Sequence, residues 1–203
     1  MEVIKNLLHQ RMLSLVEKDL DGVLIGDIEA AMPAHLCNTG TIEAMLLEMK
    51  QAGEICEEES RIIRAYPSVM DVLSDIGKET HRKIVIGRLA GRTLSDLGEE
   101  NNITRERARQ IVKNTIEKIQ HNYPRLKESK YSSLFANYII SMDDFCQAFG
   151  EDANVYRYLY FASKADKKKF QERKPLVEAM DDSRIPASVR RQLECVVDSK
   201  TKT

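Results

Sequence analysis

Residues 80–121 contain three helical segments separated by short breaks, and this stretch constrains the fold more than any other part of the chain. The first break contains Gly91 and the second contains the Asn101-Asn102 pair, residue types that favour helix ends and turns. Each segment follows a threonine whose hydroxyl oxygen is expected to accept a hydrogen bond from the first helical turn: Thr80, Thr93 and Thr104. A short helix, a turn of about three residues and a long helix form a helix-turn-helix.

The long helix, from Thr104 to about Gln120, has two chemically different faces when its residues are spaced at about 100°. One face is expected to pack on the other two helices and carries Ala108, Ile111, Val112, Thr115 and Ile119. The opposite face carries long polar side chains: Arg105, Glu106, Arg109, Gln110 and Lys113.

This polar face has the chemistry needed to read DNA bases. Arginine forks onto guanine, glutamine onto adenine, and glutamate accepts from cytosine N4. The predicted base contacts are therefore Arg105, Glu106, Arg109, Gln110 and Lys113. The predicted phosphate contacts, which position the protein without reading sequence, are Arg92, Thr93, Thr104, Arg107 and Lys118. A solvated face on an ordinary surface helix is the alternative that this pattern leaves open.

The charge distribution decides how the formal net charge of −1 is interpreted, since nucleic-acid binders are usually basic. Residues 1–81 carry 7 Lys/Arg and 15 Asp/Glu, whereas residues 82–130 carry 12 and 6. Residues 131–203 carry 12 and 11. The basic charge thus coincides with the predicted helix-turn-helix, and DNA is expected to meet that part of the chain while the acidic part stays off the duplex.

Residues 93–121, TLSDLGEENNITRERARQIVKNTIEKIQH, resemble region 4 of the sigma-70 family of bacterial RNA polymerase sigma factors. Twelve positions match the family pattern: Thr93, Leu94, Leu97, Gly98, Ile103, Thr104, Arg105, Glu106, Arg107, Arg109, Gln110 and Ile111. The resemblance implies that this segment reads a −35 promoter element through the major groove. It implies base contacts at Arg105, Glu106 and Gln110, with Arg107, Arg109 and Lys118 as basic positions near the groove and backbone.

The chain also departs from that family. Asn101 stands where the family has a core Phe or Leu, and Gly87 and Ala108 stand where larger aliphatic residues are usual. Nothing resembles the aromatic-rich region 2, so the chain is interpreted as a sigma-region-4-like regulator and not as a complete sigma factor. Region 4 of the family also binds the flap of the RNA polymerase β subunit, which makes RNA polymerase a second expected partner.

Three modules are predicted, at residues 1–67, 68–123 and 124–203, in a mainly all-α protein. The first is winged-helix-like: three helices precede a small β-hairpin formed by residues 54–56 and 61–66. Its third helix and hairpin tip are rich in glutamate (Glu57, Glu58 and Glu59 at the tip), which favours a protein-contact or structural role over DNA binding.

The third module, residues 124–203, is expected to be helical, since 11 of the 12 Tyr and Phe residues lie beyond residue 120 and can build a core of their own. Its Lys167-Lys168-Lys169 run, with Arg173 and Lys174, is either a phosphate contact or a solvated helix end. The module is expected to brace the long helix or to make a dimer contact.

No catalytic motif, metal-ligand spacing or cofactor-binding loop is present in the sequence, so a non-enzyme without metal or cofactor is expected. Cys37, Cys56, Cys146 and Cys195 are widely separated and are interpreted as reduced thiols in a cytoplasmic protein with no membrane span. The prediction is a sequence-specific double-stranded DNA-binding transcription regulator. An RNA polymerase accessory protein, the DNA-targeting part of a longer protein, and a homodimer remain open.

Overall fold

The computed structural model describes residues 2–36, 38–58, 60–164 and 167–201. The chain divides into two compact units, Met1–Tyr66 and Pro67–Thr203. The described residues are mainly helical with a small antiparallel hairpin, which confirms the predicted fold class. Within them, no helix combines the length and the apolar character needed to cross a membrane.

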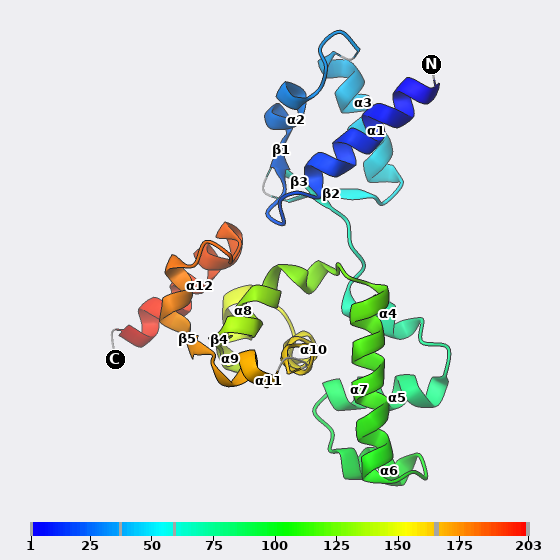
Figure 1. Ribbon diagram of the computed structural model, residues 1–203, viewed down its shortest axis with the longest axis vertical. Helices are drawn as coiled ribbons and strands as arrows, with labels where there is room; N and C mark the ends of the chain where they lie inside the picture. Colours follow the sequence, from blue (N-terminus) through cyan, green and yellow to red (C-terminus); the bar gives the residue numbers. More distant parts are fainter. Residues whose placement is uncertain (1, 37, 59, 165–166, 202–203) are drawn as a thin grey trace. The chain divides into compact units, whose positions relative to one another are not determined.

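Among its described residues, the first unit has three helices and a three-stranded antiparallel sheet with strand order β1-β3-β2 (Figure 1). Its elements are α1 (Glu2–Val16), β1 (Val23–Leu24), α2 (Ile25–Ala31), α3 (Thr39–Gln51), β2 (Ile55–Glu58) and β3 (Arg61–Arg64). The predicted hairpin is β2–β3, in which Ile55 pairs with Arg64 and Glu58 with Arg61. Sequence reasoning missed β1, because two residues are too few to give an alternating pattern.

Aliphatic and methionine side chains fill the core of this unit. Met12, Ile28, Met49 and Ile62 are almost completely buried. Asn38 caps α3, since the Thr41 N–H donates to its Oδ1 at 2.9 Å. The surface beside the core holds an open groove of about 900 Å³, lined by residues of α1, of α3 and of the loop before α3.

The second unit contains nine α-helices, two 3-10 helices and one short parallel strand pair among its described residues. In chain order they are α4 (Val69–Ser74), α5 (Glu79–Leu89), α6 (Leu94–Glu100), α7 (Arg105–Asn122), η1 (Lys127–Tyr131), α8 (Ser132–Asn137), β4 (Tyr138–Ile139), α9 (Met142–Phe149), α10 (Ala153–Ser163), α11 (Lys167–Gln171), β5 (Lys174–Pro175), η2 (Leu176–Asp181) and α12 (Ala187–Thr201). The β4–β5 pair was not expected in a segment predicted to be helical.

One hydrophobic core runs through this unit, from Val69 in α4 to Leu193 in α12. Helix α10 packs against both α5 and α7 (Figure 1). A buried polar contact also joins α4 to η1, because both carboxylate oxygens of Glu128 accept from the Val69 N–H, at 3.1 and 3.2 Å. The predicted boundary at residues 123 and 124 lies between α7 and η1, inside this single core, and the division into three modules stays a prediction.

Aromatic rings of the C-terminal segment pack mostly against one another. Phe145 lies 5.2 Å from Tyr131 and 5.3 Å from Phe135 in edge-to-face geometry, measured between ring centroids. Phe135 in turn contacts Tyr156 at 5.3 Å. Such pairs stabilise a core beyond their buried area. These rings therefore build a core within the C-terminal segment, as the sequence predicts.

Candidate nucleic-acid interface

Two of the three predicted threonine caps are present. The Asp96 N–H donates to the Thr93 hydroxyl oxygen at 3.2 Å, and the Arg107 N–H donates to that of Thr104 at 3.1 Å. The Thr80 cap was wrong, because α5 already begins at Glu79 and Thr80 lies in its first turn. The Glu79 carboxylate suits the positive end of the helix dipole and pairs with Lys83 at 2.7 Å, which favours the earlier start.

The turn between α6 and α7 depends on a close approach of two backbones. A Cβ added at Gly98 would lie 2.8 Å from the carbonyl oxygen of Ile103. The Ile103 N–H donates to the Gly98 carbonyl at 2.9 Å, and Asn102 adopts a left-handed φ of 54°. The Asn101 side chain donates to the Leu97 carbonyl at 2.8 Å. Asn101, which departs from the family pattern, thus makes a hydrogen bond at the end of α6 in place of the core contact of a Phe or Leu.

Gly87 of α5 lies directly against the side chain of Leu97 in α6. A Cβ at Gly87 would lie 2.6 Å from Cδ2 of Leu97, which is itself 1% exposed. Leu97 therefore fills the space that a larger side chain on α5 would take. This complementary pair keeps α5 and α6 close together despite the unfavourable helix propensity of glycine.

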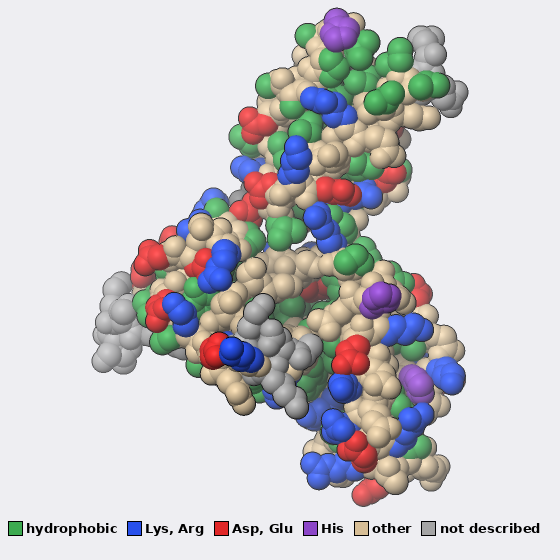
Figure 2. Space-filling view, viewed as in Figure 1, with side chains coloured by type: hydrophobic (Ala, Val, Ile, Leu, Met, Phe, Trp, Pro, Cys, Tyr) green, Lys and Arg blue, Asp and Glu red, His purple; other side chains and the backbone are tan. Residues whose placement is uncertain are grey.

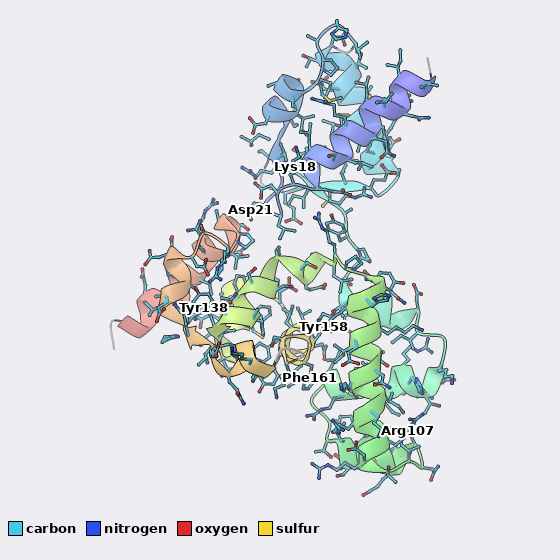
Figure 3. The ribbon with its side chains drawn as sticks, in the orientation of Figure 1. Lys18, Asp21, Arg107, Tyr138, Tyr158 and Phe161 are labelled. Carbon is cyan, nitrogen blue, oxygen red and sulfur yellow. The ribbon has the colours of Figure 1, made fainter. Side chains whose placement is uncertain are left out.

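Helix α7 presents two faces, as its periodicity predicts. Its buried residues are Ala108, Ile111, Val112, Ile116 and Ile119, whereas Thr115 is only half-buried. The ten candidate contact residues are all exposed: Arg92, Thr93, Thr104, Arg105, Glu106, Arg107, Arg109, Gln110, Lys113 and Lys118. Figure 3 labels Arg107 near the end of α7 that adjoins α6.

The candidate base contacts lie within reach of one groove. At about 1.5 Å per residue, Arg105 and Lys113 are roughly 12 Å apart along the axis, close to the major-groove width of about 12 Å. Lys118 lies about 20 Å from Arg105 by the same measure. The structure therefore groups Arg105 to Lys113 at the helix N-terminus and leaves Lys118 at a distance that suits a backbone contact.

A hydrogen-bonded network covers this face. The Arg109 guanidinium donates to both carboxylate oxygens of Glu106, at 2.7 and 2.6 Å. Gln110 donates to Glu106 at 3.4 Å and accepts from Arg107 at 3.3 Å. The hydrogen bond from Arg109 lowers the pKa of Glu106 and raises the pKa of Arg109. Glu106 therefore holds its basic neighbour in one orientation.

Glutamates also pair with two further candidate contact residues. Arg92 forms an ion pair with Glu100, which raises the pKa of Arg92, and Lys113 lies 3.6 Å from Glu117. Figure 2 accordingly shows positive and negative side chains interspersed around the helix-turn-helix. Exposed pairs of this kind are weak and screened by salt, so they exchange readily for a phosphate or a base edge.

Comparison with known protein families decides the nature of this segment. Residues 70–121, about a quarter of the chain, match the family model described as Sigma-70, region 4. These residues form a sigma-70 region 4 domain. The region 4 domain is a DNA-binding, non-enzymatic helix-turn-helix, and it connects the chain with transcription. The chain matches no curated protein and no solved structure.

The described residues contain no group of three or more His, Cys, Asp or Glu side chains that could hold a metal ion. Cys56, Cys146 and Cys195 are thiols, and Cys37 lies outside the described residues.

Sequence reasoning missed Arg157, which lies on α10. Its Nη1 donates to the Leu89 carbonyl at 2.7 Å, at the end of α5, and its Nη2 approaches the turn at Gly91. The two hydrogen-bonded residues are 68 positions apart, so no local pattern reveals the contact.

Proposed function

We propose that this chain is a sequence-specific regulator of transcription that inserts α7 of its region 4 domain into the major groove of double-stranded DNA. The observation that carries the proposal is the exposed face at the N-terminus of α7, where Arg, Glu and Gln side chains stand on a capped, well-packed helix. A helix-turn-helix enters the groove at this end of its second helix. The proposal extends the transcription-related role of the domain to a defined site and mode of binding.

The proposed base contacts are Arg105, Glu106, Arg109, Gln110 and Lys113. Arg109 and Glu106 form an exposed ion pair in the free protein, which a base edge must replace on binding. Since Arg109 donates and Glu106 accepts, the pair is suited to adjacent guanine and cytosine groups.

The proposed phosphate contacts are Arg92, Thr93, Thr104, Arg107 and Lys118. Thr93 and Thr104 stand at helix N-termini, where backbone N–H groups and the helix dipole favour an anion. Arg92 and Lys118 add charge on either side of the α7 face. These contacts would set the register of the domain on the duplex.

The first unit is proposed to be a winged helix that does not touch the duplex. Its element order, α1-β1-α2-α3-β2-β3, is the order expected for that fold. The exposed side chains of Glu57 and Glu58 lie at the end of β2, and Glu43 and Glu48 are exposed on α3. Carboxylates at the wing and on the third helix repel phosphate, so the unit suits a protein partner.

Selection of bound duplexes from a random pool tests the proposal and supplies the target site. Arg109→Ala and Gln110→Ala should each cost about 1–3 kcal/mol on that site and relax the preference at one base pair. Lys118→Ala should weaken all sequences alike. A palindromic site would indicate a homodimer with half-sites about one DNA turn apart. Failure of the chain to bind any duplex at low salt would refute the proposal.

The second candidate function is contact with RNA polymerase in a bacterial cytoplasm. The first unit favours it, because residues 1–66 carry 6 Lys/Arg and 12 Asp/Glu, a charge suited to a basic protein surface. Retention of polymerase on the immobilised chain, undiminished in the Gln110→Ala variant, would support this role. The same chain could then serve as the DNA-targeting part of a longer protein, which the full reading frame would reveal.

A further inference from the structure

Among the described residues of the second unit, four cations lie over aromatic rings, and three of them lie over rings of α10 and α11, outside the α7 face. The Arg88 guanidinium lies 5.3 Å from the ring centroid of Phe161. Lys164 Nζ lies 4.2 Å from that of Tyr160, and the Arg173 guanidinium lies 3.8 Å from that of Phe170. We call Arg88, Lys164 and Arg173 the ring-backed cations.

The rings form one continuous row. The centroid of Tyr160 lies 6.0 Å from that of Phe161 and 5.4 Å from that of Phe170. Tyr156 stacks on Tyr160 at 6.1 Å and donates its hydroxyl to the Ile140 carbonyl at 3.0 Å. Tyr156 thereby anchors the row in the core. The cations therefore lie against rings that the core holds in place.

This row starts at the turn that leads into α6. Arg88 donates to the Arg92 carbonyl at 2.8 Å while its guanidinium lies over Phe161 of α10. Arg157, also on α10, donates to the Leu89 carbonyl in the same turn. Phe161 is labelled beside α10 in Figure 3. The ring-backed cations therefore form a series that begins beside Arg92, a proposed phosphate contact. The series follows α10 to Lys164 at its end and to Arg173 after α11.

Charge pairing distinguishes these cations from three of the candidate contact residues of the region 4 domain. Arg92, Arg109 and Lys113 each pair with a glutamate. Within the described part of the chain, no carboxylate pairs with any ring-backed cation. Lys164 is exposed, whereas Arg88 and Arg173 are half-buried. Residues 164–174 carry 6 Lys/Arg and 2 Asp/Glu, so a strong positive potential is expected there.

We infer that the ring-backed cations are a second DNA-contact surface, which binds phosphates of the same duplex outside the segment read by α7. The inference rests on the proposed function. Phosphate is the expected ligand because cations and neighbouring rings lie against these rings. The surface therefore offers positive charge and N–H donors, and it does not offer free ring faces on which bases could stack. The contact therefore adds affinity without sequence preference.

The salt dependence of binding tests this inference. Lys164→Gln and the double variant Lys164→Gln/Arg173→Gln remove charge but keep a side-chain stem against the rings. Lys174→Gln is the matched control, since it removes one charge from the same segment where Lys174 is paired with Glu178 at 3.0 Å. Each dissociation constant is measured from 50 to 200 mM KCl on the selected site with about ten flanking base pairs on each side.

Each lost phosphate contact should reduce the slope of log K against log [KCl] by about 0.9, and the double variant should lose about 1.8. Over a fourfold rise in salt, wild-type affinity should then fall about twelvefold more than that of the double variant. The Lys174→Gln slope should equal wild type, and trimming the flanks should abolish the difference. Thermal unfolding of every variant checks that folding is intact.

Equal slopes for the folded double variant and wild type would overturn the inference. If Gln110→Ala still relaxed base preference in the same experiment, the proposed function would stand alone. An acidic protein partner for the ring-backed cations would then be the alternative. Absence of duplex binding by the wild-type chain would instead overturn both.

Discussion

Gly98→Ala is expected to break the turn on which the DNA-binding face depends. The added Cβ would lie 2.8 Å from the Ile103 carbonyl oxygen and 3.3 Å from the Arg105 nitrogen. Both are backbone atoms, so no side-chain rotation relieves the contact. Alanine gains about 1 kcal/mol over glycine in helix propensity. Overpacking costs about 1–3 kcal/mol, and separation of the helices also weakens the Ile103–Gly98 hydrogen bond.

The net expected loss for Gly98→Ala is about 1–2 kcal/mol of unfolding free energy, or a few degrees in Tm for the second unit. The matched control is Gly77→Ala, because a Cβ at Gly77 meets nothing within 4 Å in the same unit. Denaturant unfolding followed by circular dichroism measures both, and gel shift measures DNA affinity. A Gly98→Ala protein as stable as wild type, with unchanged affinity, would refute the proposed turn geometry.

Three further substitutions test the packing of each unit. Burial raises the pKa of Glu128, so ionisation of its carboxyl opposes folding, and wild-type stability should fall as the pH rises past the unfolded-state pKa. Glu128→Gln has no such group and should therefore gain stability relative to wild type between pH 4 and pH 7. Urea titrations that show no such trend would contradict this. Gly26→Ala in α2, where a Cβ meets nothing within 4 Å, should stabilise the first unit by up to about 1 kcal/mol in a thermal melt, and a loss of stability would contradict it. Arg157→Ala leaves the Leu89 carbonyl without its side-chain donor and should destabilise the second unit by about 1–3 kcal/mol in chemical denaturation, whereas an unchanged midpoint would show that solvent replaces the guanidinium.

Local patterns predicted the helix-turn-helix because its determinants lie within a few residues of one another. Thr93 and Thr104 act on N–H groups three positions away, and the buried face of α7 follows from helical periodicity. Thr80 failed because a threonine near a helix start does not exclude an earlier start, which Glu79 provides. Local reasoning therefore succeeds where one interaction dominates and fails where two neighbouring residues compete.

Contacts between distant segments escaped sequence reasoning. The β4–β5 pair joins Tyr138 to Lys174 in parallel register, and two-residue strands have no periodicity to detect. Glu128 reaches Val69 across 59 positions, so its role as acceptor follows only from the fold. The ion pairs on the polar face of α7, by contrast, lie at helical spacing within one helix and are local contacts. The contact between Arg92 and Glu100 depends on how the α5–α6 turn directs the arginine.

Under the proposed function, the two sets of cations in the second unit make different contributions to DNA binding. On the α7 face, glutamates pair with Arg109 and Lys113, so a proposed DNA contact at either residue would replace an existing pair, and only a base edge or phosphate of correct geometry would make that exchange favourable. Such competition lowers affinity for wrong sequences, which is the requirement for specificity. The ring-backed cations have no carboxylate to displace among the described residues, so the proposed phosphate contacts should add affinity to every sequence equally. Specificity should therefore fall with changes on α7, whereas salt sensitivity should fall with changes at Lys164 and Arg173.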